Sequence, residues 1–293
     1  LAASEKQAID AALASLSAEA PRFWTRADRV WNARGGSHTD GGAFLFDVRR
    51  TADGAGELVC TDKFGRRIEV GERARPLRRD DLVTDPSPIS AAADSAALFE
   101  EARTGLPSWT YAQLRGFLGE LTGRLDDDGA RGHAIATLTG LIERRYPTGD
   151  LRRSSVVALC DDALTRVFTA VRSAPSQGYV HHAHGGSRPQ AASPAQTVIV
   201  DATGYPPEGA DSLALEVNAL IARGFRRVIV ANCGGQRFLG NGLGPGSEGV
   251  RIDVYGSSGD YLASGIDGAE VVVHGNAQDQ LAQIMKAGKL VVH

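Results

Sequence analysis

The order of apolar and polar residues predicts helices in the middle of the chain and short strands on either side of them. Leu114, Phe117, Leu118 and Leu121 recur at three- and four-residue spacing, which places them on one face of a helix over 108–125. Similar spacing predicts three further helices, over 94–103, 134–145 and 155–172. Together these segments predict a small helical bundle.

Strand-like runs flank the bundle, and turn residues separate them. Before the bundle, predicted strands cover 43–48, 57–61 and 67–70. After it, a strand is predicted over 197–200, a helix over 212–223 and a strand over 227–231. At the start of the chain, Ser4 and Gln7 have capping-box spacing, and the helix that they begin ends at Pro21.

Composition divides the chain into three parts. The segment 175–196 is rich in Ser, Gly, Pro, His and Gln, which is typical of an interdomain linker. We therefore predict an α+β domain over 1–174, a linker over 175–196 and a second domain over 197–293.

The second domain contains a repeat. The run Arg251–Gly256 is followed by the similar runs Glu270–Gly275 and Lys289–His293, so a strand and a glycine return about every nineteen residues. Of the 35 glycines, sixteen lie in the last 93 residues. A fixed period near twenty with one strand per unit is typical of a solenoid whose strands stack in parallel. A meander with regular turns is the alternative.

Length, charge and cysteine content restrict the class of protein. The chain has 293 residues, 42% of them hydrophobic, and a net charge of −3, which offers no general basic surface for nucleic acid. No apolar run reaches the roughly 18–20 residues of a membrane span. Cys60, Cys160 and Cys233 are too far apart for a zinc or iron–sulfur motif, so we expect a reducing cytoplasm.

Two groups of residues suggest ligand binding, but each has a simpler interpretation. The glycine-rich segment 234–244 follows a strand, yet no helix begins there to bind a phosphate, so we interpret it as turns. His181, His182 and His184 could bind a metal, but no Asp, Glu or Cys nearby completes the set. We interpret them as part of a surface linker and predict no metal site.

Candidate nucleophiles and acidic residues also have structural explanations. Cys160 lies among apolar positions of a predicted helix, so we expect it in the core. Cys233 ends a strand beside two glycines and could be exposed, but no general base is identifiable near it. The run Asp126–Asp128 lacks the alternating ligands of a calcium loop and is interpreted as a solvated turn. We predict no catalytic residue and leave cofactor-binding residues unknown.

Residues 197–293 resemble the glycine-repeat (GXGXG) domain that closes the large subunit of glutamate synthase. A similar domain forms a separate subunit of formylmethanofuran dehydrogenase. The resemblance is carried by the segments 232–238, 256–260, 275–279 and 285–292. The family domain is a right-handed parallel β-helix, and the resemblance implies an architectural role beside amidotransferase and flavin domains. The chain departs from the family at 280–283, where glycines are replaced, and it contains no flavin-barrel sequence or cysteine cluster.

We therefore expect a non-catalytic scaffold within a flavin or iron–sulfur oxidoreductase or amidotransferase complex. FMN or an iron–sulfur cluster would belong to a partner domain or subunit, with no cofactor in this chain. Because His293 lies inside a strand of the repeat, we expect further coils or a partner chain to cover that edge. Two alternatives remain. One is an enzyme whose site includes His38 in the segment 31–38, and the other is a ligand sensor that uses the turn Asp201–Gly204.

Overall fold

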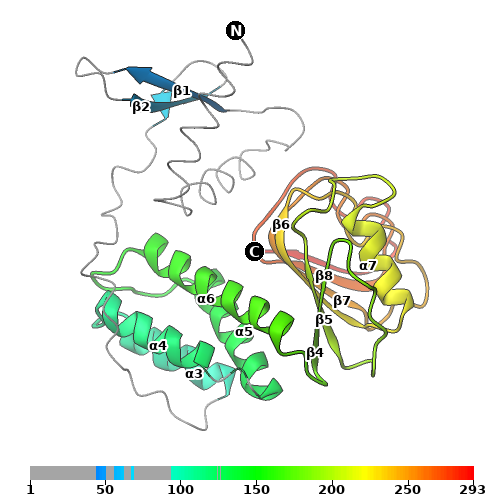
Figure 1. Ribbon diagram of the computed structural model, residues 1–293, viewed down its shortest axis with the longest axis horizontal. Coiled ribbons are helices and arrows are strands. Elements are labelled where there is room, and N and C mark those ends of the chain that lie inside the picture. The colour runs from blue at the N-terminus through cyan, green and yellow to red at the C-terminus, as the bar shows by residue number, and fades with distance from the viewer. Residues whose placement is uncertain (1–43, 51–55, 63–66, 69–93, 124, 126) are drawn as a thin grey trace.

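A computed structural model of the protein describes residues 44–50, 56–62, 67–68, 94–123, 125 and 127–293 (Figure 1). The helix predicted from Ser4 to Pro21 and the segment 31–38 with His38 lie outside the described residues. The first described elements are strands β1 (Phe44–Arg50), β2 (Gly56–Asp62) and β3 (Arg67–Ile68). They pair antiparallel in the order β1-β2-β3, close to the three predicted runs.

Four helices follow, as the periodicity predicts. They are α3 (Ser95–Gly105), α4 (Tyr111–Gly123), α5 (Asp128–Glu143) and α6 (Arg153–Ser173). Asp94 caps α3 by accepting a hydrogen bond from the Ala97 amide at 2.9 Å. Asp127 caps α5 in the same way through the Ala130 amide at 2.8 Å. Part of the acidic run predicted as a solvated turn therefore begins a helix.

Six strands form one parallel sheet beside these helices. They are β4 (Tyr179–Ala183), β5 (Thr197–Asp201), β6 (Arg227–Gly234), β7 (Arg251–Ser258), β8 (Asp267–Val273) and β10 (Ala287–Val292). Their order across the sheet is β10-β8-β7-β6-β5-β4, and the short β9 (Asn276–Ala277) pairs with the end of β7. Helix α7 (Leu213–Ala222) connects β5 to β6. The segment predicted as a linker thus contributes the edge strand β4.

Helices cover both faces of the sheet (Figure 1). Side chains alternate between the faces of a strand, so Ile199 and Ile229 pack in one core with helices α3 to α6. Val198 and Val200 face the other way and pack with Val217 of α7. This two-sided burial explains why β5 and β6 are nearly continuous apolar runs.

The predicted fold class, an α+β domain followed by a right-handed β-helix solenoid, is wrong. In the described residues the chain has an α/β fold, with a seven-stranded sheet, β9 included, and five helices that cover it. The predicted bundle is not separate from the sheet, because Ile199, Ile229 and Ala231 belong to the same core as the helices. A period near twenty specifies parallel strands in register. It does not specify what packs on each face of those strands, and here helices do so.

The nineteen-residue spacing sets the register of β7 with β8 and of β8 with β10. Arg251 pairs with Glu270, nineteen positions later, and Glu270 pairs with Lys289 after another nineteen. The recurring glycines lie where adjacent backbones come closest. A Cβ atom on Gly256 would lie 2.2 Å from the Cys233 carbonyl oxygen. These glycines therefore allow neighbouring strands to approach without a collision between a Cβ atom and the adjacent backbone.

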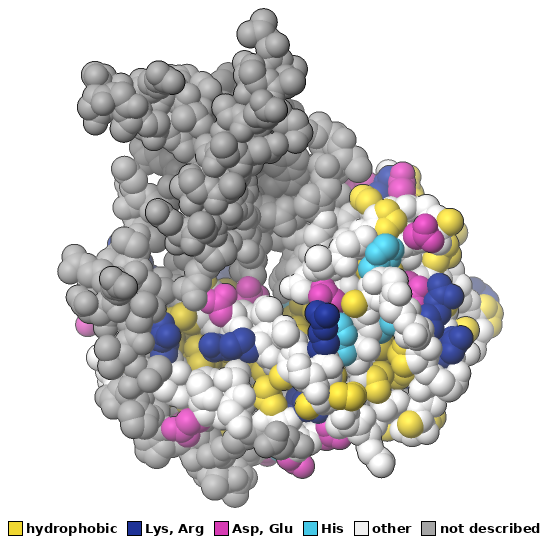
Figure 2. All heavy atoms as spheres, viewed as in Figure 1, with side chains coloured by type: hydrophobic (Ala, Val, Ile, Leu, Met, Phe, Trp, Pro, Cys, Tyr) yellow, Lys and Arg dark blue, Asp and Glu magenta, His cyan; other side chains and the backbone are white. Residues whose placement is uncertain are grey.

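The outer surface carries charges of both signs. Lys and Arg side chains are interspersed with Asp and Glu on the described part of the face that Figure 2 shows. Within the described residues, no helix combines the length and apolar character that crossing a membrane requires.

The stacked glycines yield a first testable prediction. Gly256→Ala should destabilise the fold by about 2 kcal/mol or more, because Gly256 has φ of +117° and its new Cβ would meet the backbone of β6. Gly244→Ala is the matched control, since a Cβ at Gly244 meets nothing within 4 Å. Urea unfolding measures both variants. Equal stability of the two variants would contradict the close approach of β6 and β7.

Candidate functional site

A cluster of ionisable side chains lies where the sheet meets the end of helix α5. Asp253 belongs to β7, His274 directly follows β8, His293 directly follows β10, and Glu143 is the last residue of α5. Parallel register aligns His274 and His293 with Tyr255 of β7, and Asp253 lies two positions before Tyr255 on the same face of that strand. The Tyr255 and His274 rings stack with centroids 4.3 Å apart, and His274 and His293 stack at 5.8 Å.

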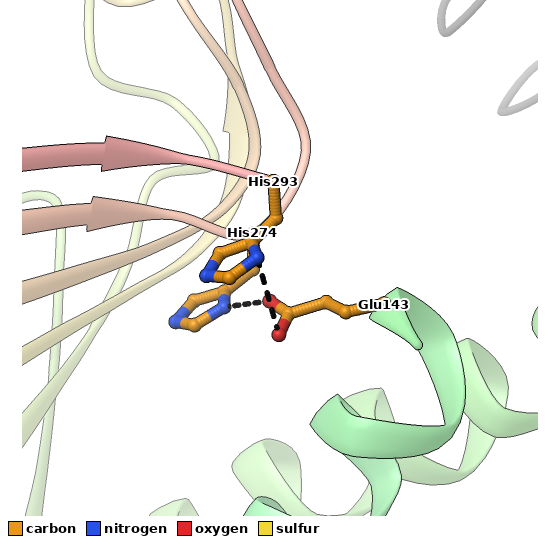
Figure 3. Close-up of side chains that lie close together, drawn as sticks. All are labelled: Glu143, His274 and His293. Carbon is orange, nitrogen blue, oxygen red and sulfur yellow. Dashed lines mark hydrogen bonds and ion pairs between the residues drawn. The ribbon is translucent and has the colours of Figure 1, made fainter. Parts of the chain in front are cut away.

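His274 is held from both sides by carboxylates, and Figure 3 shows one of them, Glu143. Its Nε2 lies 2.9 Å from Asp253 Oδ1, and its Nδ1 contacts Glu143 Oε1. Arg251 donates to both oxygens of Asp253, from Nε at 2.8 Å and Nη2 at 2.7 Å. The Asp253 carboxylate is therefore fixed, and it fixes the orientation of the His274 ring in turn.

Electrostatic interactions within the cluster favour the charged forms of His274 and Asp253. Burial alone would lower the pKa of His274, but Asp253 and Glu143 outweigh it, so that pKa is raised. Burial would likewise raise the pKa of Asp253, but His274 and Arg251 outweigh it, and that pKa is lowered. The cluster consequently attracts a positive charge to the His274 position.

Helix contacts hold the cluster against the sheet. The hydroxyl groups of Thr139 on α5 and Tyr255 on β7 lie 2.9 Å apart, and Phe168 on α6 contacts the Tyr255 ring edge-on with centroids 5.0 Å apart. Burial raises the pKa of Tyr255, so its hydroxyl stays protonated. The stacked Tyr255 ring thus supports one side of His274.

His293 lies on the solvent side of the cluster. Its Nδ1 is 3.7 Å from Glu143 Oε2, and its side chain is 41% exposed. Ligand atoms from Glu143, His274 and His293 all lie within 4.8 Å of one another (Figure 3). Two imidazoles and one carboxylate form a ligand set for a first-row divalent transition metal.

Sequence reasoning missed this group. His274 and His293 are both fifth in two consecutive repeat runs, so their proximity could have been inferred from the period. Glu143 could not, because it lies 131 positions from His274 and meets it only through packing of α5 on the sheet.

The histidines considered at the sequence level do not gather into a ligand set. His181 and His182 are consecutive in β4, so their side chains point to opposite faces of the sheet. His182 is buried and contacts Glu216 of α7 at 2.8 Å, while the His184 ring packs edge-on against Tyr205, with centroids 4.8 Å apart. These residues anchor β4 and the turn that follows it.

The other sequence candidates are also engaged in the fold. Cys160 is buried in the helical core, as predicted, and burial raises its pKa to about 12. Cys233, whose position at a strand end left exposure open, is also buried, and its pKa is raised to about 12 for the same reason. The Asp201 carboxylate accepts hydrogen bonds from the Thr203 amide and from Asn232 Nδ2, each at 3.0 Å. It therefore holds the turn after β5 against strand β6.

Comparisons with known proteins identify no relative of this chain. No protein-family model, curated protein or solved structure matches it.

The contacts of α7 with β4 yield a second prediction, for pH dependence. Arg188 donates to both oxygens of Glu216, with Nε and Nη2 each 2.9 Å from one oxygen, and His182 adds a third contact. Burial would raise the pKa of Glu216, but Arg188 and His182 outweigh it and lower that pKa below its ordinary value of 4.5. A depressed folded-state pKa stabilises the protein above 4.5, and this contribution disappears as pH falls below that value.

Glu216→Gln should therefore cost about 1–3 kcal/mol at pH 7. The stability gap to the unmodified protein should narrow as pH falls below about 4.5. Urea unfolding at several pH values measures this gap. Glu208→Gln is the control, because Glu208 pairs with Arg237 at the surface and has a side chain that is 54% exposed. A gap that stays constant down to pH 3 would refute the assigned role of Glu216.

Proposed function

We propose that the chain is a non-catalytic structural part of an oxidoreductase or amidotransferase assembly of the glutamate synthase type. FMN or an iron–sulfur cluster would then be bound by a partner domain or subunit. The resemblance of residues 197–293 suggests this role, and the role does not depend on a solenoid. One observation supports it most strongly. The edge strand β10 pairs with β8 on one side, and its outer side is exposed.

The backbone of β10 offers hydrogen bonds to an additional strand. The His293 amide donates to the Val273 carbonyl at 3.0 Å, so odd-numbered residues of β10 direct their backbone groups toward β8. Leu290 and Val292, by alternation, direct theirs outward. Val292 is 43% exposed. An open edge of this kind recruits an extended segment by β-strand addition.

Charges in register indicate which strand fits. Arg251, Glu270 and Lys289 occupy equivalent positions, with Arg251 Nη1 at 3.2 Å and Lys289 Nζ at 3.4 Å from Glu270 Oε1. Signs therefore alternate across the sheet from β7 to β10. The strand that continues this alternation places a carboxylate beside Lys289. We assign it to the partner domain or subunit.

The state of the two described cysteines favours scaffolding and bears on the compartment. Cys160 and Cys233 keep their protons because of burial, which disfavours either thiol as a nucleophile. Neither cysteine forms a disulfide, which supports the cytoplasm as the working compartment. The enzyme alternative centred on His38 stays a prediction, because its segment lies outside the described residues.

The proposal predicts how one backbone change affects the assembly. Val292→Pro removes an outward-pointing amide, so it should abolish partner binding while pairing between β10 and β8 persists. Val292→Thr keeps the amide and the β-branched shape, and it should bind normally. Each form is purified from the source organism, and flavin absorbance and iron content of the co-purified material are measured.

Cofactor that co-purifies with the unmodified chain and with Val292→Thr, but not with Val292→Pro, is the expected result. Equal recovery with Val292→Pro would rule out the β10 edge as the contact. Glutamine-dependent or redox turnover by the isolated chain would rule out the scaffold role itself.

A further inference from the structure

We propose that Glu143, His274 and His293 form a binding site for a Zn²⁺-class divalent metal ion. The site would join the end of α5 to strands β8 and β10. The inference rests on three features of the cluster: converging ligand atoms, a fixed supporting shell and an unbalanced negative charge. It is independent of the scaffold role and of the partner contact at β10.

The ligand atoms converge from three different elements (Figure 3). His274 and His293 present their Nδ1 atoms to opposite oxygens of the Glu143 carboxylate. Tetrahedral Zn²⁺ with bonds of about 2.0–2.2 Å needs donor atoms about 3.3–3.5 Å apart. The donors now lie within 4.8 Å of one another, so an entering ion must separate His274 Nδ1 from its hydrogen-bond partner Glu143 Oε1 and draw His293 inward. The exposed His293 ring can supply that movement.

The supporting shell prepares His274 for coordination through Nδ1. Histidines that bind metals usually donate their second ring N–H to a carboxylate, which fixes the tautomer and the ring orientation. Here Asp253 accepts from Nε2, and Arg251 holds Asp253 through two hydrogen bonds. With its proton on Nε2, a neutral His274 directs the Nδ1 lone pair toward the Glu143 carboxylate.

The local charge favours a cation between the rings. Glu143, Asp253 and Glu270 contribute three negative charges, while Arg251 and Lys289 contribute two positive charges. With neutral imidazoles, one negative charge remains uncompensated. Either a proton on His274 or a metal ion can balance it. Imidazole ligands favour Zn²⁺ and its neighbours over Mg²⁺ or Ca²⁺.

Zinc stoichiometry tests the site. Untagged full-length chain is stripped with a chelator, loaded with Zn²⁺ alone and freed of excess ion by gel filtration, and its metal content is then measured. We expect His293→Ala to lose one ion per chain, because it removes a ligand at an exposed position. His133→Ala should retain the full content, since His133 is an exposed histidine on α5 outside the cluster.

Three further measurements separate coordination from nonspecific adsorption. Co²⁺ loading should produce visible ligand-field bands that His293→Ala abolishes. Asp253→Asn should weaken Zn²⁺ affinity by about 10–100-fold, because Asp253 orients a ligand without binding the ion. Glu143→Gln should also lose the ion, and circular dichroism checks that this variant remains folded.

The decisive comparison is between the unmodified chain and His293→Ala. Equal zinc content in these two proteins would overturn the proposal, as would the absence of bound zinc in the unmodified chain. In the latter case a proton on His274 balances the two carboxylates. His293 is exposed, so this comparison remains valid even if Glu143→Gln fails to fold.

Discussion

Parallel pairing in register is the constraint on which the sheet and the candidate site both depend. Every backbone amide of an inner strand needs an acceptor on the neighbouring strand, and from Glu270 and Lys289 onward β7, β8 and β10 align at an offset of nineteen residues. Side chains at equivalent positions therefore become neighbours. Opposite charges meet in one column, aromatic rings stack in another, and glycine occupies positions where two backbones nearly touch.

Helix α5 meets the sheet through charged side chains at Glu143. The alternation of charge there offsets the cost of burying those side chains. Arg251, Asp253, His274 and Glu143 form a chain of alternating charge, when His274 is protonated, in which each buried group has a partner. An isolated carboxylate at this depth would cost several kcal/mol. On one side of this chain of charges, the Phe168 ring packs edge-on against Tyr255. The same arrangement that stabilises the contact between α5 and the sheet also creates a cation site.

Local patterns predicted most elements of the described chain but not their assembly. Helices α4 and α6 follow from apolar spacing, and strands β5 to β8 and β10 follow from short apolar runs. Helix α5 begins six residues before the predicted start, because Gly129 and Gly132 interrupt the apolar pattern in its first turns. Strand β4 was not anticipated, since its two histidines and small residues resemble a linker. The β-helix prediction failed because a repeat period describes strand spacing and not the layers that cover the strands.

The sequence by itself determined most of the elements, the nineteen-residue offset and the glycines that permit close strands, because these depend on neighbours along the chain or on one repeated interval. It therefore already implied that His274 and His293 lie side by side. Only the tertiary structure decided that α5 places Glu143 opposite them, and that α7 joins β4 through Glu216. Such contacts arise when separate apolar faces pack to exclude water, and that packing selects partners by shape, which no local pattern encodes.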